Sequence, residues 1–396
     1  MAKEMILEKI EQAVQILNEK NIDMWMTYVR ETGNMKDPML DMIVGTGATW
    51  QSAFIITKSG NTHAVIGSLE HENMKMIGTY KNIHPYLKNI KEELIKVLDI
   101  YKPKTIAINY SRNSTLADGL PHGLYLELID HLKDTPYVNS LISSEDIVAT
   151  LRGRKSDTEI SHIKSAIKET LLIFDEVTKF LKSGKTEKEV ADFVLDIVAK
   201  KGLELSWDKE HCPAVFSGPN TAGAHASPTE RKIEYGHVVN MDFGVKINGY
   251  AADLQRTWYI CQPGETEAPA EVQRGFNVIV ESITKAANEL KPGKKGYEID
   301  EVARHYIQVK GYAEYPHGLG HQVGRFAHDG GCLLGPKWER YNNLPYLEIE
   351  ERNVFTLEPR LTIDNYGIAT VEEMVVVTKD GCEFLSPRQM ELILVK

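Results

Sequence analysis

The chain has 396 residues, and its 46 Lys and Arg against 56 Asp and Glu give a net charge of −10 at neutral pH. This acidic balance argues against a nucleic-acid-binding surface as the main function, and 42% apolar with 26% charged residues is ordinary for a globular protein and unlike a disordered one. No stretch approaches the roughly 18 apolar residues of a membrane-spanning helix, and the first residues lack the apolar region of a secretory signal.

The first 150 residues combine helical and strand-like segments. Apolar residues recur with helical spacing over 4–20 and again over 90–98. Four short apolar runs are typical of strands: 24–29, 53–57, 62–66 and 105–109. The turn sequence at 58–61 predicts a hairpin between the second and third of these runs. We therefore expect a mixed α/β domain over residues 1–150.

The character of the sequence changes at a charged joint, residues 151–155. Capping boxes that begin at Ser156 and Thr186 predict two helices, which end near residues 181 and 200. These signals place a second domain over residues 151–396.

This second domain contains one internal repeat. The sequence Leu-Lys-Ser-Gly-Lys at 181–185 matches Leu-Lys-Pro-Gly-Lys at 290–294, and the same offset of 109 carries Lys-Gly at 201–202 onto Lys-Gly at 310–311. Both copies have the pattern of a helix, a Gly-containing turn and a second helix. We interpret them as two related halves packed about a shared centre. Two unrelated helical hairpins with the same turn chemistry are the alternative.

A predicted hairpin brings two aspartates together. An Asn-Gly pair at 248–249 is a strong signal for a two-residue turn. The register that this turn sets places Asp253 opposite Gly244, with Asp242 two residues along on the same face. Two carboxylates that converge in this way repel each other unless a positive charge lies between them.

A second predicted hairpin repeats this arrangement with two glutamates. A turn at 363–367 joins strand-like segments at 353–362 and 367–378, and its register sets Glu358 directly opposite Glu372. Like charges directly opposite each other destabilise a sheet. A single acidic residue in a strand is usually an edge or surface residue, but two hairpins that each converge an acidic pair favour a functional site.

Histidines cluster in the run from Pro316 to His328. His317 and His321 are four residues apart, as in a helical zinc motif, but the glycines between and after them argue against a helix, and no Glu follows His317. We expect an irregular loop or strand whose backbone passes close to another segment. His225 adds a further histidine from an earlier loop, although a lone histidine is more often a core or surface residue.

Four carboxylates and one imidazole suit two divalent ions of the Mn, Co, Fe or Zn type better than one tetrahedral zinc. Two such metals, about 3.5–4 Å apart, can share a hydroxide and hold a tetrahedral intermediate.

The spacing of these residues resembles that of the pita-bread metallopeptidases, which include methionine aminopeptidase, Xaa-Pro aminopeptidase, Xaa-Pro dipeptidase (prolidase) and creatinase. The matching residues are Asp242, Asp253, His321, Glu358 and Glu372, supported by Ser-Gly-Pro-Asn at 217–220 and the His-x-x-Gly-His-x-x-Gly run at 317–324. The resemblance covers about 151–390. It implies an α+β chain with a C-terminal pita-bread (creatinase/aminopeptidase) fold of pseudo-twofold halves, preceded by a smaller α/β creatinase/prolidase-like N-terminal domain.

The resemblance also implies residue roles. Asp242, Asp253, His321, Glu358 and Glu372 would bind two divalent metal ions, with Mn or Co preferred to Zn or Fe. Glu358 would accept the proton of the attacking water. His225 and His328 would line the site and stabilise the oxyanion or the leaving group, and His317 would contact substrate.

The implied enzyme is a dinuclear metallopeptidase that hydrolyses Xaa-Pro bonds, at the N-terminus of peptides or in dipeptides, by a hydroxide that bridges two metals. We expect a small peptide substrate, no nucleic-acid or membrane partner, and a homodimer. The four cysteines are far apart and form no Cys-x-x-Cys pair, which indicates reduced thiols and a cytoplasmic location.

Three departures from the family pattern keep other functions open. Asp-Gly-Gly at 329–331 follows His328 where the peptidases usually have Glu and then Pro, Thr370 stands where the prolidase branch usually has Arg, and the segment 332–341 is unlike the usual loop. The alternative is a same-fold hydrolase or lyase that acts on a small non-peptide, as creatinase and ectoine hydrolase do. A third hypothesis, a non-catalytic binding module, predicts decayed metal ligands, and none is decayed here.

Overall fold

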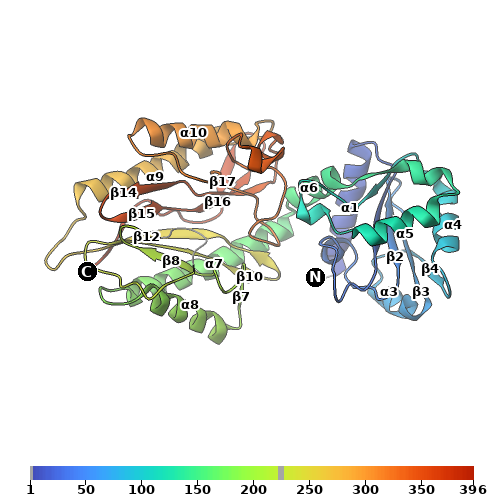
Figure 1. The fold of residues 1–396 in the computed structure, drawn as a ribbon, viewed down its shortest axis with the longest axis horizontal. Coiled ribbons are helices and arrows are strands. Elements are labelled where there is room, and N and C mark those ends of the chain that lie inside the picture. Colours follow the sequence, from blue (N-terminus) through green and yellow to red (C-terminus); the bar gives the residue numbers. More distant parts are fainter. Residues whose placement is uncertain (1–2, 222–226) are drawn as a thin grey trace. The chain divides into compact units, whose positions relative to one another are not determined.

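The computed structural model of the chain describes residues 3–221 and 227–396. Its helices and strands divide into two units, one that ends at Arg152 and one that begins at Gly153 (Figure 1). Within the described ranges, no helix is both long enough and apolar enough to cross a membrane.

The N-terminal unit is built on one six-stranded sheet in the order β4-β3-β2-β1-β5-β6. Its strands are β1 (Met24–Val29), β2 (Ser52–Thr57), β3 (Thr62–Gly67), β4 (Asn82–Tyr86), β5 (Ile106–Ile108) and β6 (Leu141–Ser143). The β1–β2 and β2–β3 pairs are antiparallel and the other pairs are parallel. The predicted hairpin is confirmed, since β2 and β3 are joined through a turn in which the Thr57 amide donates to the Asn61 carbonyl (3.0 Å).

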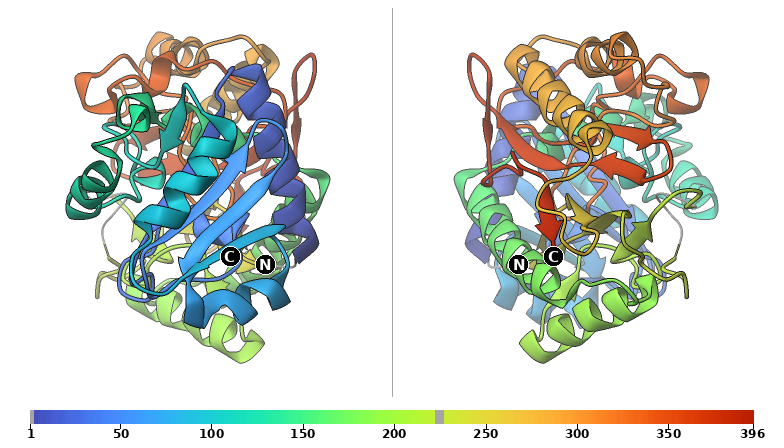
Figure 2. Two further views of the ribbon diagram at one scale, coloured as in Figure 1. Left: turned by 90° about the vertical axis from the view of Figure 1, so that its right-hand side faces the viewer. Right: turned by 90° about the vertical axis from the view of Figure 1, so that its left-hand side faces the viewer.

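Helices cover both faces of this sheet (Figure 2). One face packs against α1 (Lys3–Glu19), α2 (Leu40–Ile43) and α6 (Glu145–Gly153), and its core includes Trp25 and Phe54. The other face packs against α4 (Lys91–Tyr101) and α5 (His122–Leu132), and its core includes Tyr28 and Ile55. A short helix, α3 (His71–Ile77), follows β3. Because successive side chains of a strand point to opposite faces, the central strands are apolar on both sides.

In the C-terminal unit, two helical pairs lie on opposite sides of a set of short sheets (Figure 1). The pairs are α7 (Asp157–Phe180) with α8 (Glu187–Lys201), and α9 (Ala270–Glu289) with α10 (Gly296–Val309). The strands are β7 (Glu204–Leu205), β8 (Ala214–Ser217), β9 (Val238–Phe243), β10 (Val245–Ile247), β11 (Tyr250–Ala251), β12 (Leu254–Ile260), β13 (Val354–Leu357), β14 (Arg360–Ile363), β15 (Gly367–Thr370), β16 (Glu373–Val377), β17 (Cys382–Phe384) and β18 (Ile393–Val395). They form sheets in the orders β18-β12-β9-β8, β11-β10-β7, β13-β16-β17 and β14-β15. The mixed helices and sheets confirm the α+β class.

The helix starts in this unit agree with the capping signals. Ser156 and Thr186 each accept a hydrogen bond from the amide three residues later, and each of those residues, Glu159 and Glu189, accepts in return from the cap amide. Each cap satisfies amide groups that would otherwise lack a partner at the helix end.

The internal repeat in the sequence is also a structural repeat. The amides of Gly184 and Gly293 donate to the carbonyls of Ile233 and Ile349, at 2.8 and 2.9 Å, and each isoleucine amide donates back, at 2.8 Å, to the residue after the glycine. Both glycines have positive φ angles, +92° and +84°, which only glycine adopts without strain. The same pair of bonds is made by both glycine turns, which lie 109 residues apart, and this supports two related halves over two unrelated hairpins.

Candidate metal centre

The two aspartates lie where β9 and β12 meet the smaller sheet. Gln255 pairs with Asp242, as the register set by the Asn-Gly turn predicts. The ladder is interrupted at Gly244, where an added Cβ would lie 1.8 Å from the Ala252 carbonyl oxygen, so the backbones approach too closely for any other residue. The interruption leaves Asp253 between β11 and β12, with 5% of its surface exposed.

The two glutamates lie where the second hairpin passes from one sheet to another. β13 pairs with β16, and β14 pairs with β15, in the predicted register, in which Glu358 and Glu372 are opposite each other. The sequence predicts continuous strands here, but the ladder breaks at both positions. Pro359 has no amide hydrogen to donate, and the Glu372 amide donates instead to the Gln255 carbonyl (3.2 Å). This bond carries Glu372 to β12, beside the aspartates.

His321 belongs to an irregular segment that runs along β13. Its amide donates to the Thr356 hydroxyl (3.1 Å), and the Thr356 amide donates to the His321 carbonyl (2.9 Å). At Gly320 an added Cβ would lie 1.9 Å from the Thr356 carbonyl oxygen. The predicted non-helical segment, with glycine at a close backbone approach, is therefore confirmed.

These elements bring together the five residues that the sequence singled out. His321 Nε2 lies 3.2 Å from Glu358 Oε1 and 3.8 Å from Asp253 Oδ2. The ligand atoms of Asp253, His321 and Glu372 lie within 4.8 Å of one another. Asp242 lies close enough to Asp253 for the two negative charges to repel each other.

Burial makes most of these carboxylates hard to ionise. Burial, and after it the neighbouring negative charges, raise the pKa of Asp242, Asp253 and Glu372 well above the usual range. Burial also opposes ionisation of Glu358, but the hydrogen bond and charge of His321 outweigh it and hold the Glu358 pKa below its usual range. Three carboxyl groups therefore need either protons or nearby cations to be neutralised.

The donor set fits divalent cations. Asp242 Oδ1 and both carboxylate oxygens of Glu372 are buried and accept no hydrogen bond in the part of the chain that the structure describes. Orphaned acceptors of this kind are costly without a partner. Four carboxylates balance the charge of two divalent ions, and an oxygen-rich set with one imidazole suits Mn, Co, Fe or Zn.

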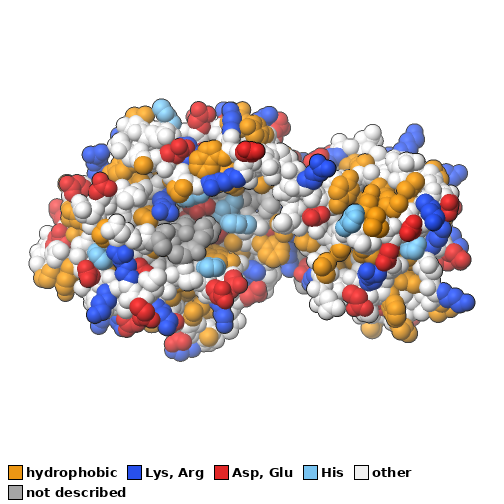
Figure 3. All heavy atoms as spheres, viewed as in Figure 1, with side chains coloured by type: hydrophobic (Ala, Val, Ile, Leu, Met, Phe, Trp, Pro, Cys, Tyr) orange, Lys and Arg blue, Asp and Glu red, His pale blue; other side chains and the backbone are white. Residues whose placement is uncertain are grey.

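The other candidate histidines are placed differently. The His328 ring lies edge-on to the His321 ring, with centroids 4.1 Å apart, and His328 is exposed. His317 is half-buried, with Nδ1 2.8 Å from the Gly318 carbonyl oxygen, and burial lowers the pKa of its imidazole. His225 lies outside the described residues. Histidine side chains gather on the face of the C-terminal unit drawn in Figure 3.

The sequence did not indicate a role for Gln255. Its Nε2 donates to Glu358 Oε2 (3.2 Å), and its Oε1 accepts from the Thr370 hydroxyl (3.1 Å). One signal was available, because Gln255 is two residues from Asp253 and strand alternation places both side chains on one face.

Asp329, one of the departures from the family pattern, belongs to a buried ion pair. Its Oδ2 lies 3.3 Å from Lys155 Nζ, and each side chain is 1% exposed. Its Oδ1 accepts from the Phe326 amide (3.3 Å). The pair therefore fixes the loop that carries His328.

The unusual segment at 332–341 forms an aromatic and cationic cluster. The rings of Trp338 and Tyr341 are stacked, with centroids 5.9 Å apart, and the Arg340 guanidinium lies 4.6 Å from the Trp338 ring. Pro316, Trp338 and Arg340 line a hollow of about 390 Å³. Since Pro316 precedes His317, this segment lies next to one of the candidate substrate contacts.

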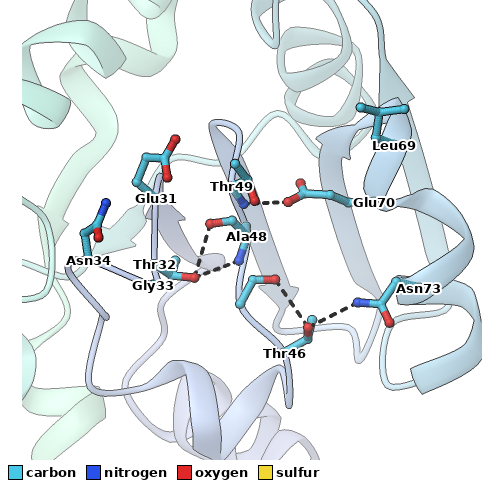
Figure 4. Close-up of a pocket in the computed structure, with 11 residues that line it drawn as sticks. Glu31, Thr32, Gly33, Asn34, Thr46, Ala48, Thr49, Leu69, Glu70 and Asn73 are labelled. Carbon is cyan, nitrogen blue, oxygen red and sulfur yellow. Dashed lines mark hydrogen bonds between the residues drawn. The ribbon is translucent and has the colours of Figure 1, made fainter.

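A second hollow, of about 580 Å³, lies in the N-terminal unit (Figure 4). Its polar groups bond to one another: the Ala48 amide donates to the Thr32 hydroxyl (2.8 Å), and the Thr49 amide donates to Glu70 Oε1 (2.5 Å). None of the residues that line it is His or Cys. The converging carboxylates and imidazole therefore favour the C-terminal unit as the location of the functional site.

Comparisons with known proteins agree with this location. The model of metallopeptidase family M24 matches residues 161–379, a range that contains all five candidate ligands. An Xaa-Pro dipeptidase of Pyrococcus horikoshii is 27% identical over 393 residues, which cover 98% of this chain and 99% of that protein.

Two solved structures are similar over nearly the whole chain. The X-Pro aminopeptidase of Thermotoga maritima has a TM-score of 0.70 at 26% identity. The Xaa-Pro dipeptidase of Bacillus anthracis has a TM-score of 0.72 at 25% identity. Each match covers 98% of this chain and 99% of the other chain.

Proposed function

Because the chain belongs to metallopeptidase family M24 and has its pita-bread fold, we propose that it is a two-metal enzyme that hydrolyses Xaa-Pro bonds. The observation that carries the proposal is the convergence of four carboxylates and His321 in one largely buried group. The names of the full-length relatives, Xaa-Pro dipeptidase and X-Pro aminopeptidase, support the substrate class.

The proposed metal ligands are Asp242, Asp253, His321, Glu358 and Glu372. The burial of Asp253 and Glu372 and the orphaned oxygens of Asp242 and Glu372 support this assignment. The oxygen-rich donor set supports Mn or Co ahead of Zn or Fe as the metals in use.

When bound, two divalent cations supply a Lewis acid for the scissile carbonyl and lower the pKa of a nearby water. Glu358 is the proposed acceptor of the proton that this water loses. The charge and hydrogen bond of His321 favour the ionised form of the Glu358 carboxylate and hold it in one place. A carboxylate that is ionised before the reaction can take up a proton during it.

His317 and His328 are the proposed substrate contacts, with His225 as a third from outside the described residues. His317 is half-buried, and burial favours its neutral imidazole, which can still donate a hydrogen bond to an oxyanion. The proximity of the His328 and His321 rings supports a place for His328 beside the scissile bond.

Several finer points belong to the same proposal. Residues 1–150 would be a creatinase/prolidase-like N-terminal domain and residues 151–396 the metal-dependent catalytic domain, which the division of the chain between Arg152 and Gly153 supports. A homodimer follows from the family resemblance alone. The four free cysteines support a cytoplasmic location. A small non-peptide substrate, the alternative raised by the sequence, is not favoured, because the relatives that match the whole chain carry Xaa-Pro peptidase names.

The proposal is tested by a product assay on Mn-loaded protein with its bound metal counted. The substrates are Ala-Pro, Ala-Pro-Ala and, as the specificity control, Ala-Ala. We expect release of alanine from at least one proline peptide at a rate well above that from Ala-Ala, and none from the Asp253→Ala variant. The preferred length separates a dipeptidase from an aminopeptidase. Intact proline peptides in the presence of metal-loaded protein would contradict the proposal.

A further inference from the structure

We propose that Gln255 is a positioning residue that holds the Glu358 carboxylate in one orientation, and that Thr370 holds the other end of the Gln255 amide in place. The inference rests on the proposed function, because it gives these two residues a purpose at the same centre. Strand β12 contains this glutamine, and the family resemblance assigns no role to it.

Gln255 connects β12 to both glutamates. Its backbone carbonyl accepts from the Glu372 amide (3.2 Å), and its side-chain Nε2 donates to Glu358 Oε2 (3.2 Å). The residue is 4% exposed, so water does not compete freely for these bonds. Because Gln255 is held at its backbone and at the end of its side chain, it loses little conformational freedom when it restrains Glu358.

The direction of the amide is set by Glu358, and Thr370 holds its far end. A glutamine amide can present either its oxygen or its NH2 group to a neighbour. The Thr370 hydroxyl donates to Gln255 Oε1 (3.1 Å), while Nε2 faces Glu358. A flipped amide would place Oε1 against the Glu358 carboxylate, where two acceptors repel. Glu358 therefore sets the direction of the amide, and the Thr370 hydroxyl, which can donate or accept, stabilises it at the other end.

The two oxygens of Glu358 have different partners. Oε1 lies 3.2 Å from His321 Nε2 and 3.4 Å from the Thr356 hydroxyl, whereas Oε2 accepts from Gln255. With a donor on each oxygen, the carboxylate plane is fixed. Loss of the Gln255 donor would free the carboxylate to rotate about its Cγ–Cδ bond, and a displaced proton acceptor lowers the rate of the chemical step.

The side chain that orients Glu358 carries no charge. The Arg256 guanidinium, next along the strand, donates to the Gln255 and Glu372 carbonyls and to the Glu373 carboxylate (2.9, 3.0 and 3.3 Å). Within the described ranges, no Lys or Arg forms an ion pair with Glu358. Gln255 therefore orients Glu358 without adding a positive charge to the centre, and the basicity of Glu358 is left to the imidazole and the cations.

The test uses the full-length enzyme, three single variants and one double variant. Gln255→Met keeps the length of the side chain and removes the amide; Thr370→Val keeps the shape and removes the hydroxyl; Thr370→Ser keeps the hydroxyl. We expect kcat for the proline peptide to fall about 10- to 100-fold in Gln255→Met, less in Thr370→Val and little in Thr370→Ser, with KM within about threefold. Because Thr370 acts through Gln255, Thr370→Val should add nothing in the Gln255→Met background.

A matched control is Thr178→Val. Like the side chain of Gln255, the Thr178 hydroxyl makes two hydrogen bonds: it accepts from Trp258 Nε1 (2.8 Å) and donates to the Phe174 carbonyl (2.9 Å). It contacts no carboxylate of the centre. A purely structural role for Gln255 predicts the same result as the control: a lower melting temperature with unchanged kcat. That result would overturn the inference.

A second readout is independent of turnover. Co²⁺ is added to the metal-free protein, and its visible absorption spectrum and affinity are recorded. We expect Gln255→Met and Thr370→Val to change the spectrum or weaken Co²⁺ binding, while Thr178→Val and Thr370→Ser match the wild type. If the wild type hydrolyses no proline peptide, the proposed function fails and this readout still decides the role of Gln255. A Gln255→Met protein with the wild-type spectrum and affinity would refute that role.

Discussion

Glu358 has the most sharply defined surroundings of the five candidate ligands. Its carboxylate accepts hydrogen bonds at both oxygens, and its pKa lies below the usual range although it is buried among other acids. These properties distinguish it from Asp242 and Glu372, which keep orphaned oxygens and raised pKa values. The hydrogen bonds to both oxygens hold the Glu358 carboxylate in place, which suits the proposed role of proton acceptor.

The first prediction concerns this residue. Glu358→Gln keeps the size of the side chain and removes its capacity to accept a proton. General-base catalysis contributes about 100- to 10,000-fold, so kcat for a proline peptide should fall by at least about 100-fold while KM changes little. Steady-state kinetics on the metal-loaded variant check this. A rate within threefold of the wild type would exclude Glu358 as the proton acceptor.

At the residue scale, the sequence predicted which side chains converge but not which residues support them. Asp242, Asp253, His321, Glu358 and Glu372 are of types that bind metals, and two hairpin registers were enough to pair four of them. Gln255 and Thr370 have no such chemistry, and their bond joins strands that are more than 100 residues apart. A tertiary contact of this kind leaves no local pattern in one sequence.

At the scale of elements, α10 fixes the segment that carries the histidines. The Arg304 guanidinium donates to both oxygens of Asp300 (2.6 and 2.8 Å) and to the carbonyls of Tyr315 (2.8 Å) and His317 (2.6 Å). Asp300 also accepts from the Leu319 amide (2.9 Å). One buried ion pair therefore anchors the approach to His321.

Removal of Arg304 should be costly. Arg304→Met keeps much of the aliphatic volume and leaves the Asp300 carboxylate buried without its partner, which typically costs about 3–5 kcal/mol of unfolding free energy. Urea unfolding of the full-length protein measures the loss. Arg274→Met, on the exposed side of α9, is the control and should stay within about 1 kcal/mol of the wild type. Equal effects of the two substitutions would mean that the pair is not structurally important.

Two histidines on β3 and β4 should make the stability of the N-terminal unit depend on pH. His63 lies with Nε2 2.7 Å from the Tyr101 hydroxyl and Nδ1 3.0 Å from His84 Nε2. Burial, and after it the charge of His84, lowers the His63 pKa to about 4, and burial lowers the His84 pKa against the opposing charge of Glu93. The fold thus favours the neutral rings.

The direction of the pH effect on the unfolding free energy follows from the difference between the folded and unfolded pKa values. Because the folded pKa of His63 lies below the unfolded value of about 6.5, its stabilising contribution is complete above pH 6.5 and is lost as the pH falls toward 4. The unfolding free energy of the wild type should therefore fall more steeply over that range than that of His63→Gln. The exposed His122→Gln variant is the control. Parallel curves for wild type and His63→Gln would contradict the prediction.

Some boundaries and registers of helices and strands could be predicted from the sequence, and others could not. Capping boxes, the turn at 58–61 and both hairpin registers were predictable because each depends on neighbouring residues. The break of the second hairpin was not, although Pro359 gave a hint. It depends on the bond from the Glu372 amide to β12, which competes with the ladder only in the folded chain.

At the scale of the whole molecule, the repeated helical pairs were readable from the sequence because they repeat a pattern over many residues. The placement of short sheets between the helical pairs was not, because strands of two to seven residues carry little signal individually. The family resemblance supplied that arrangement, and the matching bonds at Gly184 and Gly293 agree with it.

Removal of metal should act on one unit. The candidate ligands all belong to the unit that begins at Gly153, and a metal present at 100 times its dissociation constant stabilises the folded state by about 2.7 kcal/mol. Treatment with a chelator should therefore lower the melting temperature of that unit by roughly 5–10 °C and leave the N-terminal unit unchanged. Scanning calorimetry with and without Mn²⁺ measures both transitions. Identical scans would argue against a metal centre.

The most direct test of a two-metal centre is a titration of metal-free protein with Mn²⁺, in which bound metal and the initial rate of Ala-Pro hydrolysis are measured on the same samples. We predict a rate that rises with bound metal and levels off at two ions per chain, and an Asp253→Ala variant that binds less metal and stays inactive. Hydrolysis that persists without metal, or that is unchanged in Asp253→Ala, would contradict the assignment of the centre.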